Sequence, residues 1–144
     1  ANPKMGEWID GAIDADLCQK GAIDTTAIYR TGPRLLQAEG GTYLCPTIVY
    51  CESMDHPLSN REFLCPYASV VEVPQPDMLN AIGPTLVVSA ITKDETFKRQ
   101  LLSASNIERL NLGPISTMKI SWDQPHEGNM FEFLYKRRSI GMAA

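Results

Sequence analysis

The sequence has little of what several classes of protein require. Only 2 of its 144 residues are histidine, and aromatic residues make up 8%. No apolar run reaches the roughly 20 residues that a membrane-spanning helix needs, and the first residues contain no apolar signal core. No glycine-rich phosphate turn occurs. These absences argue against a membrane anchor, a visible secretory signal and a self-contained nucleotide loop.

Positive charge is also scarce. The chain has 13 Lys and Arg against 17 Asp and Glu, which gives a net charge of -4. Nucleic-acid-binding domains usually present a basic face, so neither a nucleic-acid nor a membrane partner is expected. The dense basic cluster at residues 136–138 is typical of a solvated helix end, where cations complement the helix dipole.

The cysteines form no Cys-x-x-Cys pair. They are Cys18, Cys45, Cys51 and Cys65. Three of them lie in or beside apolar stretches, where free cysteine behaves as a small buried hydrophobe. We therefore expect reduced cysteines and a cytoplasmic protein. Together with His56 and His126, their spacing matches no standard zinc motif, so no metal is expected.

The rest of the composition is that of a soluble globular protein, with 44% hydrophobic and 21% charged residues. We expect one α/β domain over residues 1–144. It is organised around two apolar strands, Tyr43–Cys51 and Tyr67–Val73, with a polar loop between them. Pro46 places the first strand at an edge or a bulge. The strand Arg34–Glu39 precedes it and is expected to form a hairpin with it.

The N-terminal part predicts less regular structure. Residues 1–11 are expected to be poorly anchored. Ile13 and Leu17 are four residues apart, which predicts a short helix over Ala12–Lys20. Asp10 and Asp14 would favour its positive end.

The later part alternates strands and helices. A helix is expected over Asp77–Ile82, followed by a strand over Leu86–Ile91 that is buried on both faces. The next helix runs from Thr92 or Asp94 to Ser103, with Phe97, Leu101 and Leu102 facing inward. A strand over Ile107–Leu112 and a helix over Gly128–Arg138 complete the order. This order predicts at least three parallel strands with right-handed crossovers, and the hairpin adds an antiparallel edge.

Several motifs, in this order, resemble the NAD(P)-dependent aldehyde dehydrogenase superfamily. They are the Pro46-Thr47 strand, Glu62-Phe63-Leu64-Cys65-Pro66 leading into a strand, a buried strand ending in Thr92-Lys93-Asp94, the strand ending at Asn111, and Pro125-His126-Glu127-Gly128. The family pattern at the second motif is Glu-x-Phe-Gly-Pro. The resemblance covers most of the chain and is weak before Gly40.

The resemblance implies a fold and a set of residue roles. The chain would correspond to the later part of the family's catalytic domain. That domain is a three-layer sandwich with a mostly parallel sheet, helices on both faces and an antiparallel edge hairpin. Glu62 matches the residue that hydrogen-bonds the nicotinamide-ribose hydroxyls. Leu64 replaces a Phe that packs near the nicotinamide, and Cys65 replaces a Gly. His126 replaces a Phe that lines the substrate entrance.

The resemblance also implies what the chain lacks. The family's nucleophile lies in a Gly-Gln-x-Cys setting, which does not occur here, and neither does its Rossmann domain. No catalytic residue is therefore assigned. The chain is expected to be a fragment or domain that is inactive alone. The parent enzyme would use NAD or NADP, bound only weakly by this chain. Its partner would be the missing N-terminal part or a second subunit, with homo-oligomers possible.

Other interpretations stay open. The chain could be a non-catalytic interaction or oligomerisation module that retains the fold. A small hydrolase or isomerase could use His126 and Glu127 with Glu62 or Asp123, if these side chains share a pocket. Glu62 is also typical of a solvated or capping residue, and Asn111 could orient a loop by bonding the backbone.

Overall fold

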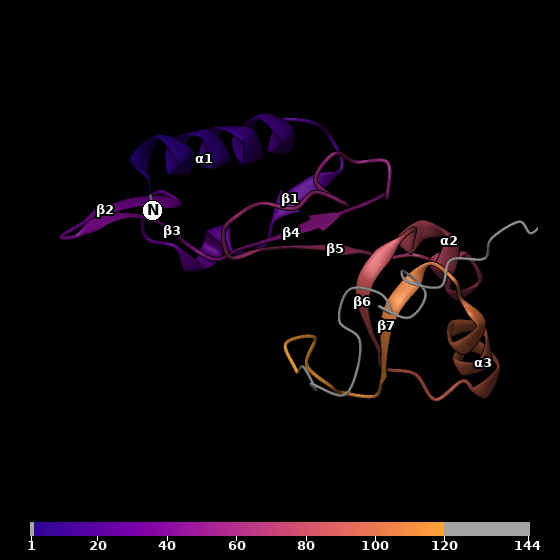
Figure 1. The fold of residues 1–144 in the computed structure, drawn as a ribbon. Coiled ribbons are helices and arrows are strands. Elements are labelled where there is room, and N and C mark those ends of the chain that lie inside the picture. The colour runs from indigo at the N-terminus through magenta and orange to yellow at the C-terminus, as the bar shows by residue number, and fades with distance from the viewer. Residues whose placement is uncertain (1, 120–144) are drawn as a thin grey trace, which may run out of the picture. The chain divides into compact units, whose positions relative to one another are not determined.

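The structure is a computed structural model that describes residues 2–119. The chain divides into two compact units, unit 1 and unit 2, with the boundary in the sequence between Gln75 and Pro76. Each unit combines helices and strands (Figure 1), which confirms the α/β class. The single domain over residues 1–144 stays a prediction. The predicted helix Gly128–Arg138 lies outside the described residues.

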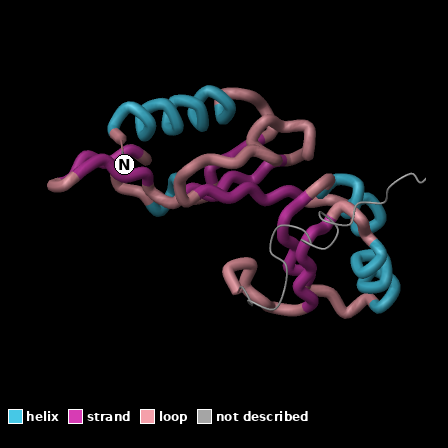
Figure 2. The backbone as a smooth tube through the Cα atoms, in the orientation of Figure 1, coloured by secondary structure: helices cyan, strands magenta, loops and turns pink. Residues whose placement is uncertain are grey.

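Unit 1 begins with a long helix. Helix α1 spans Pro3–Leu17 and is continuous (Figure 2). The Asn2 side chain caps it by accepting a 3.1 Å hydrogen bond from the Lys4 N–H, and Pro3 occupies the first helical position. The predicted start at Ala12 is therefore wrong. Asn followed by Pro is a strong helix start, and it anchors residues that we expected to be loose.

The main sheet of unit 1 has three strands in the order β1-β4-β5. They are β1 (Ala22–Asp24), β4 (Thr47–Cys51) and β5 (Tyr67–Val71). Strand β1 runs antiparallel to β4, whereas β4 and β5 are parallel. Between β1 and the hairpin lies a short 3-10 turn, Ala27–Tyr29.

The predicted hairpin is confirmed, but it is not part of the main sheet. Strands β2 (Leu35–Ala38) and β3 (Gly41–Leu44) pair antiparallel in a separate two-stranded sheet. The antiparallel edge of the main sheet is β1 instead. The single strand predicted over Tyr43–Cys51 is also wrong, because the chain breaks at Cys45 and Pro46 into β3 and β4. Proline has no N–H to continue a ladder.

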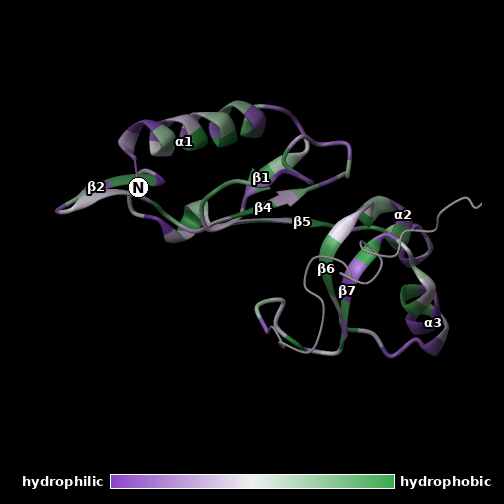
Figure 3. Ribbon diagram, in the orientation of Figure 1, coloured by the Kyte–Doolittle hydropathy of each residue, from purple (hydrophilic) through white to green (hydrophobic). Residues whose placement is uncertain are grey.

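Helix α1 packs on one face of the main sheet. The buried cluster contains Ile9, Ile13, Val49, Cys51, Leu58 and Phe63. Hydrophobic and hydrophilic stretches lie side by side along α1 (Figure 3), as expected of a helix with one buried face. All four cysteines are unpaired, with Cys51 buried and Cys18 exposed.

Unit 2 follows the predicted order closely. Its elements are α2 (Met78–Ile82), preceded by a 3-10 turn Gln75–Asp77, then β6 (Thr85–Ala90), α3 (Glu95–Ser103) and β7 (Ile107–Leu112). Gly83 ends α2 with φ of +64°, a conformation that favours glycine. Strands β6 and β7 are parallel, with Thr85 opposite Ile107.

Three details of unit 2 differ from expectation. Leu86 is exposed, so β6 is not buried on both faces, and Ile91, predicted to end this strand, lies beyond it and is exposed too. Leu102 is exposed too, whereas Phe97 and Leu101 are buried as predicted. Among residues 2–119, each parallel ladder has two strands rather than at least three. In the same part of the chain, no helix is long and apolar enough to cross a membrane.

Candidate functional site

Glu62 lies in the loop that leads into β5 and is exposed. It lines a hollow of about 530 Å³ together with Ser59, Asn60, Arg61, Phe63, Cys65, Tyr67, Ala68 and Ser69. Among residues 2–119, its carboxylate has no hydrogen-bond or ion-pair partner. An unpaired carboxylate accepts bonds only, so it suits a ligand that offers hydroxyl or N–H donors.

The loop around Glu62 is fixed on both sides. Leu58 is fully buried before it, and Phe63 is buried directly after it. The Tyr67 hydroxyl donates to the Leu58 carbonyl at 2.7 Å, and the Ser69 hydroxyl donates to the Ser59 carbonyl at 2.6 Å. Burial raises the pKa of Tyr67 from its ordinary 10.0 to about 12, so its hydroxyl stays a hydrogen-bond donor even in alkaline solution. The backbone at Glu62 is thus held while its side chain is free.

Arg61 is the cation at this hollow, and it is engaged. Its guanidinium pairs with Asp16 of α1 and lies 5.0 Å from the centroid of the Phe63 ring. Phe63 in turn meets Tyr67 edge to face, with ring centroids 4.9 Å apart. These contacts hold Phe63 in place. They also leave the hollow without an uncommitted cation for a phosphate group.

The other predicted site residues are placed differently. Leu64 is 85% exposed and does not line the hollow. Cys65 lines it, and burial raises the pKa of its thiol against the opposing charge of Arg34. Burial also raises the pKa of Cys51. Neither thiol therefore has the lowered pKa of an activated nucleophile.

His126, Glu127 and Asp123 lie outside the described residues. The hydrolase or isomerase hypothesis, which needs His126 near Glu62, stays a hypothesis.

A buried charge network was missed by the sequence reasoning. Arg34 is 8% exposed. It contacts Asp10 at 2.7 Å, Asp14 at 3.0 Å and Asp24 at 3.5 Å, and Asp24 also pairs with Arg30. Because α1 begins at Pro3, the two helical aspartates lie beyond its first turn rather than at its positive end. Their four-residue spacing places them on one helix face, which was the available signal for a shared partner.

His56 was also missed as a structural residue. Its Nδ1 accepts a 3.1 Å hydrogen bond from the Leu58 N–H and lies 3.9 Å from the Cys51 sulfur. Accepting at Nδ1 places the proton of a neutral ring on Nε2. His56 therefore supports the loop that leads to Glu62 from inside the core.

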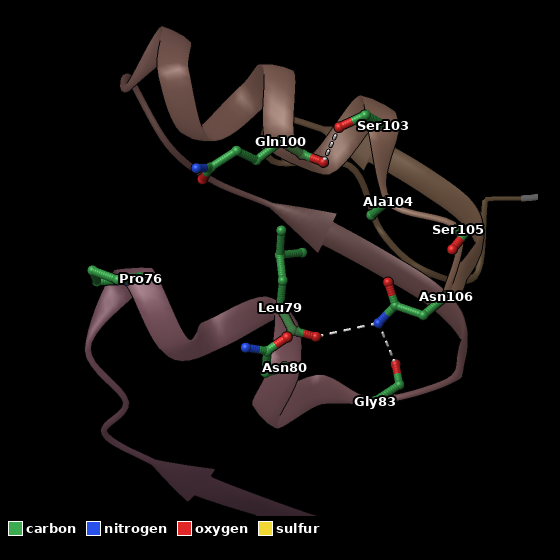
Figure 4. Close-up of a pocket in the computed structure, with 9 residues that line it drawn as sticks. All are labelled: Pro76, Leu79, Asn80, Gly83, Gln100, Ser103, Ala104, Ser105 and Asn106. Carbon is green, nitrogen blue, oxygen red and sulfur yellow. Dashed lines mark hydrogen bonds between the residues drawn. The ribbon is translucent and has the colours of Figure 1, made fainter.

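Unit 2 contains a separate hollow of about 610 Å³ (Figure 4). Its lining has no ionisable side chain and consists of Pro76, Leu79, Asn80, Gly83, Gln100, Ser103, Ala104, Ser105 and Asn106. The Asn106 amide donates to the Leu79 carbonyl at 3.2 Å and to the Gly83 carbonyl at 2.7 Å. This hollow offers no acid or base. The Glu62 hollow offers a carboxylate and contains the residue that the sequence motif singles out, so it is taken as the candidate site.

Asn111 takes part in a short chain of hydrogen bonds. Its amide donates to the Ser89 hydroxyl at 3.1 Å, and that hydroxyl donates to the Ile115 carbonyl at 2.6 Å. Asn111 thus holds the segment after β7 through Ser89. This agrees with the expected role of Asn111 in orienting a loop. Its hydrogen bond goes to a side chain, however, whereas we expected a bond to the backbone.

Residues 2–119 contain no group of three or more His, Cys, Asp or Glu side chains placed to hold a metal ion. A scan against protein-family models and a search of curated proteins both return no match.

Proposed function

We propose that this chain is the C-terminal part of the catalytic domain of an aldehyde dehydrogenase-like oxidoreductase. The observation that carries the proposal is Glu62, whose carboxylate is unpaired within residues 2–119 and faces a hollow on a firmly held loop. The order of the sequence motifs agrees with it. The chain's role in this proposal is to bind and position the cofactor, and no residue of it is assigned to bond-breaking.

The described residues fit one part of a nicotinamide cofactor. The two oxygens of Glu62 can accept hydrogen bonds from both hydroxyls of the nicotinamide ribose. Leu64, exposed beside it, can offer an apolar contact to the ring. The bound cofactor, NAD or NADP, supplies hydride acceptance. Since Arg61 is paired with Asp16, the phosphates would be held by a partner and not by this hollow.

The finer fold belongs to the same proposal. We propose a three-layer sandwich whose mostly parallel sheet has helices on both faces, completed by the missing N-terminal part or a second subunit. The proposed location is the cytoplasm, in keeping with four free cysteines.

The first test measures binding of NADH to the 144-residue chain by saturation-transfer NMR. Hydrogen bonds to a charged group contribute about 1.5–3 kcal/mol each, so Glu62→Gln is expected to weaken binding roughly tenfold. Nicotinamide alone, which lacks ribose, should be insensitive to this change. Glu72→Gln, at another exposed glutamate of unit 1, is the matched control. Equal ribose signals in parent chain and Glu62→Gln would contradict the ribose contact.

The second test is an aldehyde and NAD assay on the same chain. We expect no turnover, because formation of a thiohemiacetal requires an activated cysteine. Robust oxidation of an aldehyde would overturn the assignment as a non-autonomous part of an enzyme.

The alternative is a non-catalytic interaction or oligomerisation module. The observation that favours it is the number of large apolar side chains left exposed, Ile23, Ile48 and Val70 among them. Size-exclusion chromatography with light scattering separates the two. A strict monomer that binds NADH through Glu62 would favour the enzyme.

A further inference from the structure

The main sheet of unit 1 has one covered and one uncovered face. Thr47, Val49 and Cys51 of β4 point to the covered side and are buried. The alternate side chains point the other way: Ile23 is 63% exposed, Ile48 41% and Val70 49%. Within residues 2–75, α1 lies over the first face and no α-helix lies over the second (Figure 1).

The uncovered side chains form one apolar patch across three strands. Ile23 pairs with Tyr50, which pairs with Val70, and Ile48 pairs with Ala68. Directly opposed residues on neighbouring strands have Cβ atoms about 5 Å apart, so these five side chains adjoin. They are called the open face below.

A parallel strand pair with one bare apolar face is unusual. Parallel strands occur almost only in sheets covered on both faces, typically by helices. The β4–β5 pair is parallel, and α1 covers one side only. Each of these strands has five residues and is roughly 16 Å long, which a helix of about eleven residues matches.

Negative charge lies at one end of the open face and would determine which way round a covering helix binds. Glu52 and Glu72 directly follow β4 and β5, so both lie at the carboxyl end of the parallel pair. Both are exposed, and neither has an ion-pair partner among residues 2–119. Lys20 lines a hollow together with Glu52 but forms no ion pair with it. The complementary ligand is therefore apolar along one side and cationic at one end.

We propose that the open face is the docking surface for an amphipathic helix of a partner polypeptide. Its apolar stripe would cover the five side chains, and its Lys or Arg residues would lie over Glu52 and Glu72. The inference rests on the sheet and not on Glu62, so a failed NADH test leaves it standing.

The test uses the full chain and two stapled helical peptides of about 14 residues with the same leucine stripe. One carries three Lys at its end and the other three Glu. Fluorescence anisotropy is expected to show saturable binding of the Lys peptide. Ile48→Lys with Val70→Lys should weaken it by about tenfold or more. Glu52→Gln with Glu72→Gln should weaken the Lys peptide severalfold but not the Glu peptide.

The matched control is Leu102→Lys, which places the same charge on an exposed leucine of α3 and should change binding less than twofold. Circular dichroism checks that each variant is folded. Hydroxyl-radical footprinting of the unmodified chain needs no variant, and the Lys peptide should protect Ile23, Tyr50 and Val70 from oxidation.

Three results would overturn the proposal. Unchanged peptide affinity in the folded Lys variants would place the contact elsewhere. Protection of the open face in the free monomeric chain would mean that the chain covers it itself. A concentration-dependent dimer that the Lys variants abolish would make a second copy the occupant.

Discussion

Arg34 is the residue on which unit 1 depends most for its charge balance. Its buried guanidinium joins Asp10 and Asp14 of α1 to Asp24 of β1. Removing one side of a buried pair leaves charges uncompensated, which typically costs about 3–5 kcal/mol. We expect Arg34→Ala to lower the free energy of unfolding by roughly 3 kcal/mol, measured by urea denaturation with circular dichroism.

Arg61→Ala is the control for this prediction. The Arg61 side chain is 39% exposed and forms one ion pair, with Asp16. Exposed pairs contribute about 0–1 kcal/mol. Equal losses for the two variants would show that burial of Arg34 does not decide its contribution.

Asp24 makes the same network sensitive to acid. Burial alone would raise its pKa, but the hydrogen bonds from Thr26 and Arg30 and the Arg30 charge outweigh it, so its pKa lies below the usual 3.8. A lowered pKa in the folded state means that the stabilisation is complete above pH 3.8 and is lost as pH falls through the folded value.

Unfolding free energies measured from pH 6 down to about pH 3 should therefore fall at the acid end. Asp24→Asn should flatten this fall, whereas Glu39→Gln, at an exposed residue of the hairpin turn, should keep it. A parent slope retained in Asp24→Asn would contradict the prediction.

Side-chain partners were the least predictable feature at this scale. Glu62 could be chosen from its motif, and the structure gives it a hollow. Its anchors, Tyr67 to Leu58 and Ser69 to Ser59, depend on how the loop folds back along β5. Arg34 meets its partners from 10 to 24 residues away, a distance at which no local pattern acts.

At the scale of elements, the N-terminal cap of α3 gives a direct test. The Asp94 side chain accepts from the Thr96 N–H at 2.8 Å and the Phe97 N–H at 3.2 Å. Asp94→Ala should destabilise the chain by about 1 kcal/mol, seen as a lower midpoint in urea denaturation. Asp77 precedes α2 without such a bond, so Asp77→Ala should have a smaller effect. Equal effects would mean that capping is not the cause.

Elements with strong local signals were predicted well, and those formed by pairing were not. Strand β7 and the end of α3 agree with expectation because caps and turns are coded within a few residues. Strand β1 has only three residues. It is a strand because Ala22–Asp24 pair with β4. A segment so short carries no periodic pattern, and only its partner defines it.

At the scale of the whole molecule, the class was predictable and the strand pairing was not. Alternating strands and helices correctly indicated α/β. The same alternation suggested a shared sheet for the last three strands, but β5 pairs with β4 while β6 pairs with β7. Which strands pair depends on contacts between residues distant in sequence, and β-propensity contains no information about those contacts.

The core of unit 1 has a consequence for how the chain is made. Every residue of that core, together with those packed against it, lies between Ile9 and Val71. Protein synthesis proceeds from the N-terminus, and domains generally fold as units in that order. The nascent chain can therefore complete this core while the ribosome is still adding unit 2. At that stage residues 2–75 would have a finished interior and an apolar sheet face with no α-helix over it, the kind of surface that chaperones bind.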